Sequence, residues 1–338
     1  MTTDREWIER TLGHEETGAV PYNFMFSPPA ARRVKSHYGD DLEAALALPI
    51  RMTAPDSVKP LYASPQEFGD TLADEFGVVW STSEIDRGAP IGPCLDEPML
   101  LGYSFPDPGA AYRLAHIAEW CAGQVGHYRI IWVGDLWERA TFMRGMGDLL
   151  TDVALHPAFV EALLYNLTEY ILETMRILFG LGDFEGVALS DDYGTQKGLV
   201  MAPDSWRRFI KPCLAKIYGL AKENGRSTFL HSCGNIVSII GDLIDVGLDI
   251  LHPIQPEAMD ILELKREFGN RLTFCGGVAT QTLLVSGTPE EVRGEVQRLK
   301  REMGRGGGYI LEPGITLQDD VPLDNMVAMI DEAMRRDA

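Results

Sequence analysis

STFLHSC, residues 227–233, is the stretch that decides the fold. It is a short run of β-branched and aromatic residues that ends in polar ones, as a buried strand with a functional end would. Similar runs recur from about residue 110 onward, and longer amphipathic stretches separate them. This alternation predicts a parallel sheet with helices outside it. The other runs are HYRIIWVGD (127–135), EGVALSDD (185–192), LDILHPIQ (248–255), RLTFCGG (271–277) and GGYILEPG (307–314).

The predicted elements favour a closed barrel. A strand near AVPYNFMF (19–26) opens the series and brings the number of predicted strands to seven. Residues 157–180 repeat apolar side chains at helical spacing, and Thr288 with the Pro-Glu-Glu after it marks another helix start. Residues 27–110, rich in proline and short polar segments, predict an insertion that caps one barrel mouth. We therefore expect an α/β protein, a single (β/α)8 TIM barrel over residues 1–338 with this N-terminal capping insertion.

Charge and hydropathy exclude several classes of function. The net charge of −20 opposes binding to phosphate backbones, so we expect no nucleic-acid partner. No apolar run reaches about 18 residues, so we expect no membrane span. The charged N-terminus has no apolar core, which argues against a signal peptide and favours a cytoplasmic protein. Dinucleotide, nucleotide-triphosphate and GxSxG motifs are absent. The five cysteines are scattered and odd in number, which predicts free thiols or metal ligands: Cys94, Cys121, Cys213, Cys233 and Cys275.

FLHSCGN (229–235) is the sharpest local feature. Side chains two apart on a strand face the same way, so His231 and Cys233 are expected to point together into the barrel, as half of a zinc site. A catalytic zinc needs about three protein ligands and an open position. Glu312, at the end of the last predicted strand, is our choice for the third ligand, and Cys275 is its rival. Spacing alone also allows a buried cysteine beside a hydrogen-bonded histidine.

SDDYGTQ (190–196) carries two adjacent carboxylates at a strand end. Asp191 and Asp192 cannot face the same way, so we expect one to point into the site as a catalytic acid and the other to cap a loop; a solvated turn is the alternative. Further polar and aromatic residues are candidates for substrate binding, each as easily structural. They are Tyr22, Asn23, Phe24, Tyr193, His252, Gln255 and Gln281.

Taken together, these motifs resemble the uroporphyrinogen decarboxylase superfamily, and in particular its corrinoid-linked methyltransferase branch. The resemblance covers nearly the whole chain. It rests on segments in a fixed order: RTLGHEETGAVPYN (10–23), DDYGTQKGLVMAPDSWRRFIKP (191–212), FLHSCGN, LDILHPIQPEAMD (248–260), LKREFGNRLTFCGGVATQTLL (264–284) and GGGYILEPGITLQDDVPLDNMVAMI (306–330). The resemblance implies a (β/α)8 barrel, and with it the eighth strand.

Two activities compete within this superfamily. Its decarboxylases use no metal and grip a tetrapyrrole rich in carboxylates with basic residues, including an arginine pair near the N-terminus. The matching stretch here, PYNFMFSPPA (21–30), has no arginine, and the acidic chain suits such a substrate poorly. We therefore favour the interpretation that the protein is a methyltransferase over the interpretation that it is a decarboxylase. A barrel that has lost catalysis and serves as a binding subunit is a third reading.

The methyltransferase branch holds zinc with His-x-Cys and a C-terminal cysteine in a PGCG-like segment. His231 and Cys233 match the first two ligands, but the segment EPGIT (312–316) places Ile315 where the cysteine would fall. The resemblance then implies that Glu312 or Cys275 replaces the thiolate, or that the metal is bound differently. A site with fewer thiolates suits activation of an ether or alcohol oxygen better than activation of a thiol.

The function expected from this resemblance is methyl transfer from a small donor to the Co(I) corrinoid of a partner protein. We expect the donor to be an aryl methyl ether, whose oxygen the zinc would activate, with Asp191 or Asp192 positioning a neighbouring hydroxyl. Methanol, methylamine, methyl thiol and quaternary amines stay open as donors. The expected cofactors are zinc and the corrinoid, and the expected partners are the corrinoid protein and the methyl donor.

Overall fold

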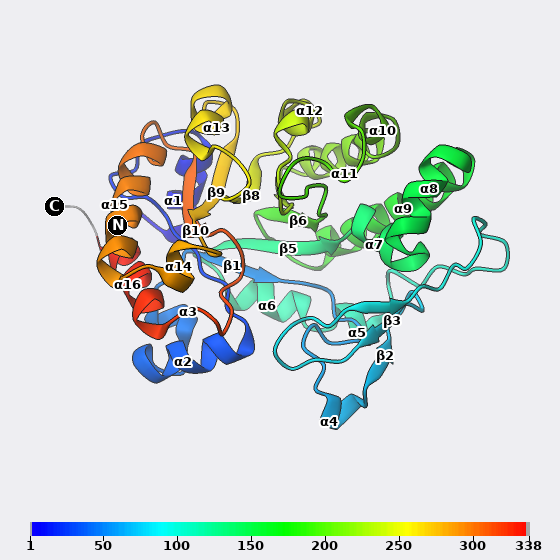
Figure 1. Cartoon of the computed structure of the whole chain (residues 1–338), viewed down its shortest axis with the longest axis horizontal. Coiled ribbons are helices and arrows are strands. Elements are labelled where there is room, and N and C mark those ends of the chain that lie inside the picture. The colour runs from blue at the N-terminus through cyan, green and yellow to red at the C-terminus, as the bar shows by residue number, and fades with distance from the viewer. Residues whose placement is uncertain (1, 336–338) are drawn as a thin grey trace.

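A seven-stranded parallel sheet forms the centre of the protein (Figure 1). The structure is a computed structural model that describes residues 2–335. The strands follow one another across the sheet in the order in which they occur along the chain, as expected for repeated strand–helix units. They are β1 (Ile50–Thr53), β5 (Tyr128–Gly134), β6 (Gly186–Ser190), β7 (Ser227–His231), β8 (Ile250–Ile254), β9 (Thr273–Val278) and β10 (Tyr309–Pro313).

The segment around Tyr22 lies beside β10, where an eighth strand would run. Tyr22 forms a parallel bridge with Leu311, whose carbonyl accepts from the Asn23 amide at 3.0 Å. A second parallel bridge joins Phe26 to Leu317. The strand expected over 19–26 is therefore present as isolated bridges. Helix α1 (Asp4–Leu12) packs against both edge strands, β1 and β10, so the sheet is curled and the predicted barrel-type fold is confirmed.

Within the main sheet, β1 is the strand that was not predicted from the sequence. Its four residues, IRMT, are too short to show a period, and it lies inside the 27–110 range that we assigned to a capping insertion. β1 belongs to the main sheet, where Ile50 pairs with Tyr128. The same range also contains a separate antiparallel sheet, seen at the lower right of Figure 1, made of β2 (Thr71–Ala73), β3 (Val79–Ser81) and β4 (Pro90–Gly92).

The helices surround the sheet, and two of them begin as predicted. Thr288 caps α15 (Pro289–Met303) with both hydrogen bonds of a capping box, and the apolar repeat over 157–180 is the 25-residue helix α9 (Pro157–Leu181). None of the helices in the described residues is long and apolar enough to cross a membrane. The remaining helices are α2 (Pro28–Tyr38), α3 (Leu42–Ala45), α4 (Pro65–Phe68), α5 (Ala111–Leu114), α6 (Ile117–Gly123), α7 (Trp137–Arg144), α8 (Met146–Leu155), α10 (Pro203–Phe209), α11 (Lys211–Glu223), η1 (Val237–Ile239), α12 (Ile240–Asp245), α13 (Ile261–Phe268), α14 (Leu283–Ser286) and α16 (Leu323–Met334).

Two hydrophobic clusters fill the molecule, one on each face of the curled sheet. The larger lies between sheet and helices, and the smaller fills the barrel interior. Because side chains alternate along a strand, the interior residues share one parity on each strand. Apolar side chains occupy the end of the barrel closed by α1, and the polar residues of the same parity follow towards the strand ends. The interior cluster consists of Ile8, Ile50, Tyr128, Ile130, Ala188, Phe229, Ile250, Cys275 and Ile310, with Leu12, Met52 and Trp132 against it.

Candidate functional site

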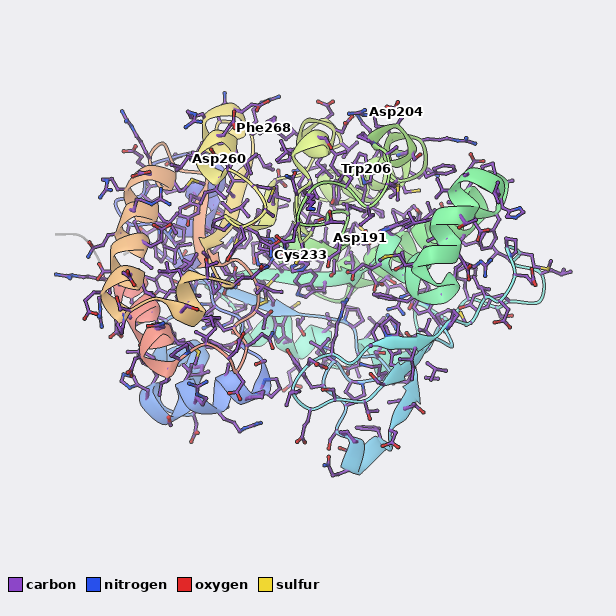
Figure 2. All side chains as sticks on the ribbon, viewed as in Figure 1. Asp191, Asp204, Trp206, Cys233, Asp260 and Phe268 are labelled. Carbon is purple, nitrogen blue, oxygen red and sulfur yellow. The ribbon has the colours of Figure 1, made fainter. Side chains whose placement is uncertain are left out.

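Three side chains with metal-binding atoms meet beyond the ends of β6 and β7. The ligand atoms of Asp192, His231 and Cys233 all lie within 4.8 Å of one another. His231 Nε2 is 3.5 Å from Cys233 Sγ and 3.7 Å from Asp192 Oδ1. The backbone amide of Cys233 donates to Asp192 Oδ1 at 2.8 Å, so the carboxylate is held at the start of the loop that carries the thiol. Figure 2 labels Cys233, which lies near the middle of the molecule.

Burial sets the protonation of this group. It lowers the pKa of His231, against the opposing charge of Asp192, so the imidazole is neutral at neutral pH. Burial also raises the pKa of the Cys233 thiol, and the carboxylates of Asp192 and Glu138 raise it further. A neutral imidazole is ready to bind a metal ion, whereas the thiol needs a bound cation before it ionises.

The two adjacent acids take different roles, as expected for neighbours on a strand end. Asp192 faces His231 and Cys233. Asp191 is fully buried, and its Oδ1 accepts from the backbone amides of Leu136 and Glu138 at 3.0 and 2.9 Å. Those amides lie at the N-terminus of α7, so Asp191 caps this helix. Asp191 therefore holds the start of α7, and the acid beside the metal-binding group is Asp192.

Glu312 and Cys275, the two candidates for a third metal ligand, contact each other inside the barrel. The Cys275 thiol donates to Glu312 Oε2 at 3.0 Å, and the Asn23 amide donates to Glu312 Oε1 at 3.2 Å. His252 lies between Glu312 and the metal-binding group: its Nδ1 is 3.0 Å from His231 Nδ1, and its Nε2 is 3.7 Å from Glu312 Oε2. Burial raises the pKa of Glu312 to about 7, although both donors oppose this shift.

The sheet order explains why Glu312 does not join the group of three. β8 and β9 lie between β7, which ends at His231, and β10, which carries Glu312. Asp192 follows β6, the direct neighbour of β7. Among residues 2–335, the acid grouped with His231 and Cys233 is therefore Asp192, in place of the Glu312 that we expected from strand parity.

Glu138 and Arg87 also lie beside this group, and neither residue was predicted from the sequence. Glu138 is in the first turn of α7; its Oε2 accepts from the Ser190 hydroxyl at 3.0 Å and its Oε1 pairs with Arg87 Nη2 at 2.9 Å. Arg87 comes from the turn between β3 and β4, so the small sheet reaches the barrel mouth. Glu138 could have been predicted, because it is an acidic residue just after the predicted strand 127–135. No motif near Arg87 in the sequence points to a role at the site.

Replacing Arg87 by methionine should raise the pKa of Glu138 above its present value. Burial, helped by Asp192 and Asp135, brings that pKa to about 7, and the Arg87 guanidinium is the main opposing charge. Because the pKa is higher in the folded than in the unfolded protein, the stability that Glu138 contributes is lost as pH rises from about 4.5 to about 7. In the variant this loss should continue to higher pH, which urea unfolding across that range would measure. Arg208→Met, on the outer surface, is the control; equal profiles for parent and Arg87→Met would contradict the assignment.

The other residues predicted to bind substrate lie in different surroundings. Tyr22 and Phe24 are buried, with rings stacked 5.7 Å apart, in the cluster between sheet and helices. Tyr193 is fully buried and donates to Asp191 Oδ2 at 2.9 Å. Gln255 is buried and accepts from the amide of Gly234 at 2.6 Å, which places it behind the loop after Cys233. Gln281 is exposed.

The Tyr22, Phe24 and Tyr193 side chains face the helix layer because they alternate with residues that face the barrel. Within the first predicted strand, Asn23 is the residue that reaches the interior polar network. A separate hollow of about 550 Å³ lies among residues 11–21 and 297–309, around the N-terminal end of β10. None of the site residues described above lines it.

A family model for uroporphyrinogen decarboxylase matches residues 133–336. The chain belongs to the uroporphyrinogen decarboxylase family. The matched range contains Asp192, His231, Cys233 and Glu312 and leaves out the Arg87 turn.

The individual relatives are named for two different activities, methyl transfer and decarboxylation. The methylcobamide:CoM methyltransferase MtaA of Methanosarcina barkeri is 27% identical over 131 residues, which are 39% of this chain and 36% of that protein. A uroporphyrinogen decarboxylase of Psychromonas ingrahamii is 24% identical over 212 residues, 59% of this chain and 56% of that one. The match thus spans about a third of the length of the curated methyltransferase.

The fold is shared over nearly the whole chain. A solved methyltransferase from Methanosarcina mazei superposes with a TM-score of 0.73, covering 98% of both chains at 19% sequence identity. At that identity the likeness establishes the fold, and the family's barrel architecture accounts for the curled sheet.

Proposed function

We propose that this protein is a zinc-dependent methyltransferase that moves a methyl group from a small donor to the corrinoid of a partner protein. The observation that carries the proposal is the group formed by Asp192, His231 and Cys233 at the C-terminal ends of the strands, where barrel enzymes place their chemistry. The M. barkeri relative is named a methylcobamide:CoM methyltransferase, which supports methyl transfer that involves a corrinoid.

The residues present fit zinc. Imidazole nitrogen, thiolate sulfur and carboxylate oxygen are its usual ligands, and three of them leave a position open, as in catalytic sites. The neutral state of His231 favours binding without loss of a proton there. When bound, zinc would supply a Lewis acid for an oxygen or another leaving atom of the methyl donor. One thiolate and one carboxylate, in place of two thiolates, favour an aryl methyl ether over a thiol as the donor.

Residues around the three ligands would shape the rest of the site. Trp132 lies edge-on to His231, with ring centroids 6.4 Å apart, and offers an apolar wall for an aromatic donor. Arg87 is 47% exposed even while paired with Glu138, so most of its five donors are free to meet an oxygen of the substrate. Glu138 holds Arg87 and Ser190 in place at the mouth.

Metal content and methyl transfer test the proposal together. Elemental mass spectrometry on the purified protein should find about one zinc per chain, as for a site with one set of ligands. The zinc-loaded protein should then transfer methyl groups from methoxylated aromatic compounds to a Co(I) corrinoid protein, followed by the corrinoid absorbance. Absence of zinc after growth in ample metal would contradict the proposal. That result would favour the alternatives, a decarboxylase or a non-catalytic binding subunit. Zinc with transfer only from a thioether or a methylamine would contradict the aryl ether donor alone.

A further inference from the structure

Two buried polar side chains, His252 and Glu312, lie in a line behind His231, the proposed zinc ligand. His231 Nδ1 lies 3.0 Å from His252 Nδ1, on the neighbouring strand β8. The far nitrogen of His252, Nε2, points at Glu312 Oε2 from 3.7 Å. His252 is 0% and Glu312 2% exposed, so no solvent competes for these atoms. His252 Nε2 has no hydrogen-bond partner at ordinary distance, which leaves Glu312 as the group that decides whether it carries a proton.

The contact between the two rings admits one proton, and its position fixes both tautomers. If His231 binds a metal through Nε2, the atom that faces Cys233 and Asp192, its Nδ1 must carry the hydrogen and donate to His252. His252 Nδ1 is then the acceptor, and His252 Nε2 carries the hydrogen that faces Glu312. In the opposite arrangement a lone pair of His252 would face the carboxylate, and His231 Nε2 would be blocked by its own proton.

Glu312 is built as an acceptor. Oε1 accepts from the Asn23 amide and Oε2 from the Cys275 thiol, so donors already meet both oxygens. Burial raises the pKa of Glu312 to about 7, so above neutral pH the carboxylate is ionised and attracts the N–H of His252 across 3.7 Å. Cys275 and Asn23 thereby both hold Glu312 in place, the acid that the sequence suggested as a metal ligand.

We propose that Glu312 and His252 are positioning residues that fix the tautomer and the orientation of His231, so that its Nε2 lone pair faces the metal. This inference rests on the proposed zinc site. Groups behind a metal-binding histidine commonly set its tautomer and raise its affinity for the metal. A residue missing from the ligand set, Glu312, would then still contribute to metal binding through two intervening rings.

Zinc affinity, measured by competition with a chromogenic chelator, tests this inference without any catalytic step. His252→Phe keeps the ring and removes both nitrogens, and Glu312→Leu removes the acceptor. Each should weaken zinc binding by about 10–100-fold, the usual loss when a group behind a ligand is removed. Glu312→Gln keeps one acceptor oxygen but loses the charge, so its zinc affinity should lie between those of the parent and Glu312→Leu. Glu185→Gln is the matched control, because Glu185 is also buried and paired, with Arg129, but lies before the start of β6.

Nitrogen-15 spectra of the histidine rings give a readout that needs no metal. The metal-free protein should show His231 protonated on Nδ1 and His252 protonated on Nε2, and Glu312→Leu should disturb this pattern. Parent affinity in folded His252→Phe and Glu312→Leu, or His252 protonated on Nδ1, would overturn the inference while leaving the zinc site standing. A parent protein that binds no zinc would overturn both.

Discussion

Cys233→Ala is expected to lose its zinc and at least about 1,000-fold in methyl-transfer rate, because metal polarisation contributes several kcal/mol and each 1.36 kcal/mol is tenfold in rate. Cys233 is the one thiol grouped with His231 and Asp192 in the described residues. Alanine removes the one thiol of the group that is found among residues 2–335. His231→Ala should behave in the same way.

Variants of two other cysteines serve as controls. They show whether zinc is lost when any thiol is removed or only when a ligand is removed. Cys213→Ala, on α11, is the control for a half-buried thiol away from the site; its Sγ donates to the carbonyl of Phe209. Cys275→Ala should also keep its zinc, since Cys275 contacts Glu312 and lies outside the group of three. Elemental mass spectrometry and corrinoid absorbance measure the two effects. Loss of zinc in Cys275→Ala with retention in Cys233→Ala would reverse the assignment, and retention of activity in both His231→Ala and Cys233→Ala would remove the zinc role.

Asp191→Ala and Asp192→Ala should fail in different ways. Asp191 accepts from two backbone amides of α7 and from the Tyr193 hydroxyl, all of them buried. Alanine leaves these donors without a partner, at roughly 1–3 kcal/mol each, so we expect a loss of about 3–5 kcal/mol in the free energy of unfolding. Asp192→Ala should leave stability nearly unchanged and weaken zinc binding, because that carboxylate is partly exposed and faces the ligands.

Asp191→Asn is the conservative control, since its amide oxygen can accept from the α7 amides and its nitrogen can donate to the tyrosine oxygen. It should recover most of the stability that Asp191→Ala loses. Urea unfolding and zinc titration of the three variants distinguish the roles. A stable Asp191→Ala with impaired methyl transfer would mean that Asp191 acts in catalysis, as the sequence alone allowed.

Much of the fold followed from local pattern. The six runs from residue 127 onward are all strands of one parallel sheet, because buried parallel strands show as short apolar runs between amphipathic helices. β1 was not predicted because four residues are too few to show a hydrophobic period. The segment at Tyr22 forms isolated bridges where we expected a strand. The weaker signals were therefore those of the shortest elements, whose pairing depends on neighbours distant in sequence.

The sequence by itself determined which residues stand near the carboxyl ends of the strands. His231 ends β7 and Cys233 follows two residues later in the loop, and this short separation along the chain keeps their side chains together. Which acid joins them was decided only by tertiary structure. Asp192 reaches the group because it follows β6, which adjoins β7. Glu312 lies on β10, which β8 and β9 separate from β7. Its carboxylate instead contacts His252, Cys275 and Asn23. Strand order and register place side chains from distant segments together, and neither is encoded in the local period of any one segment.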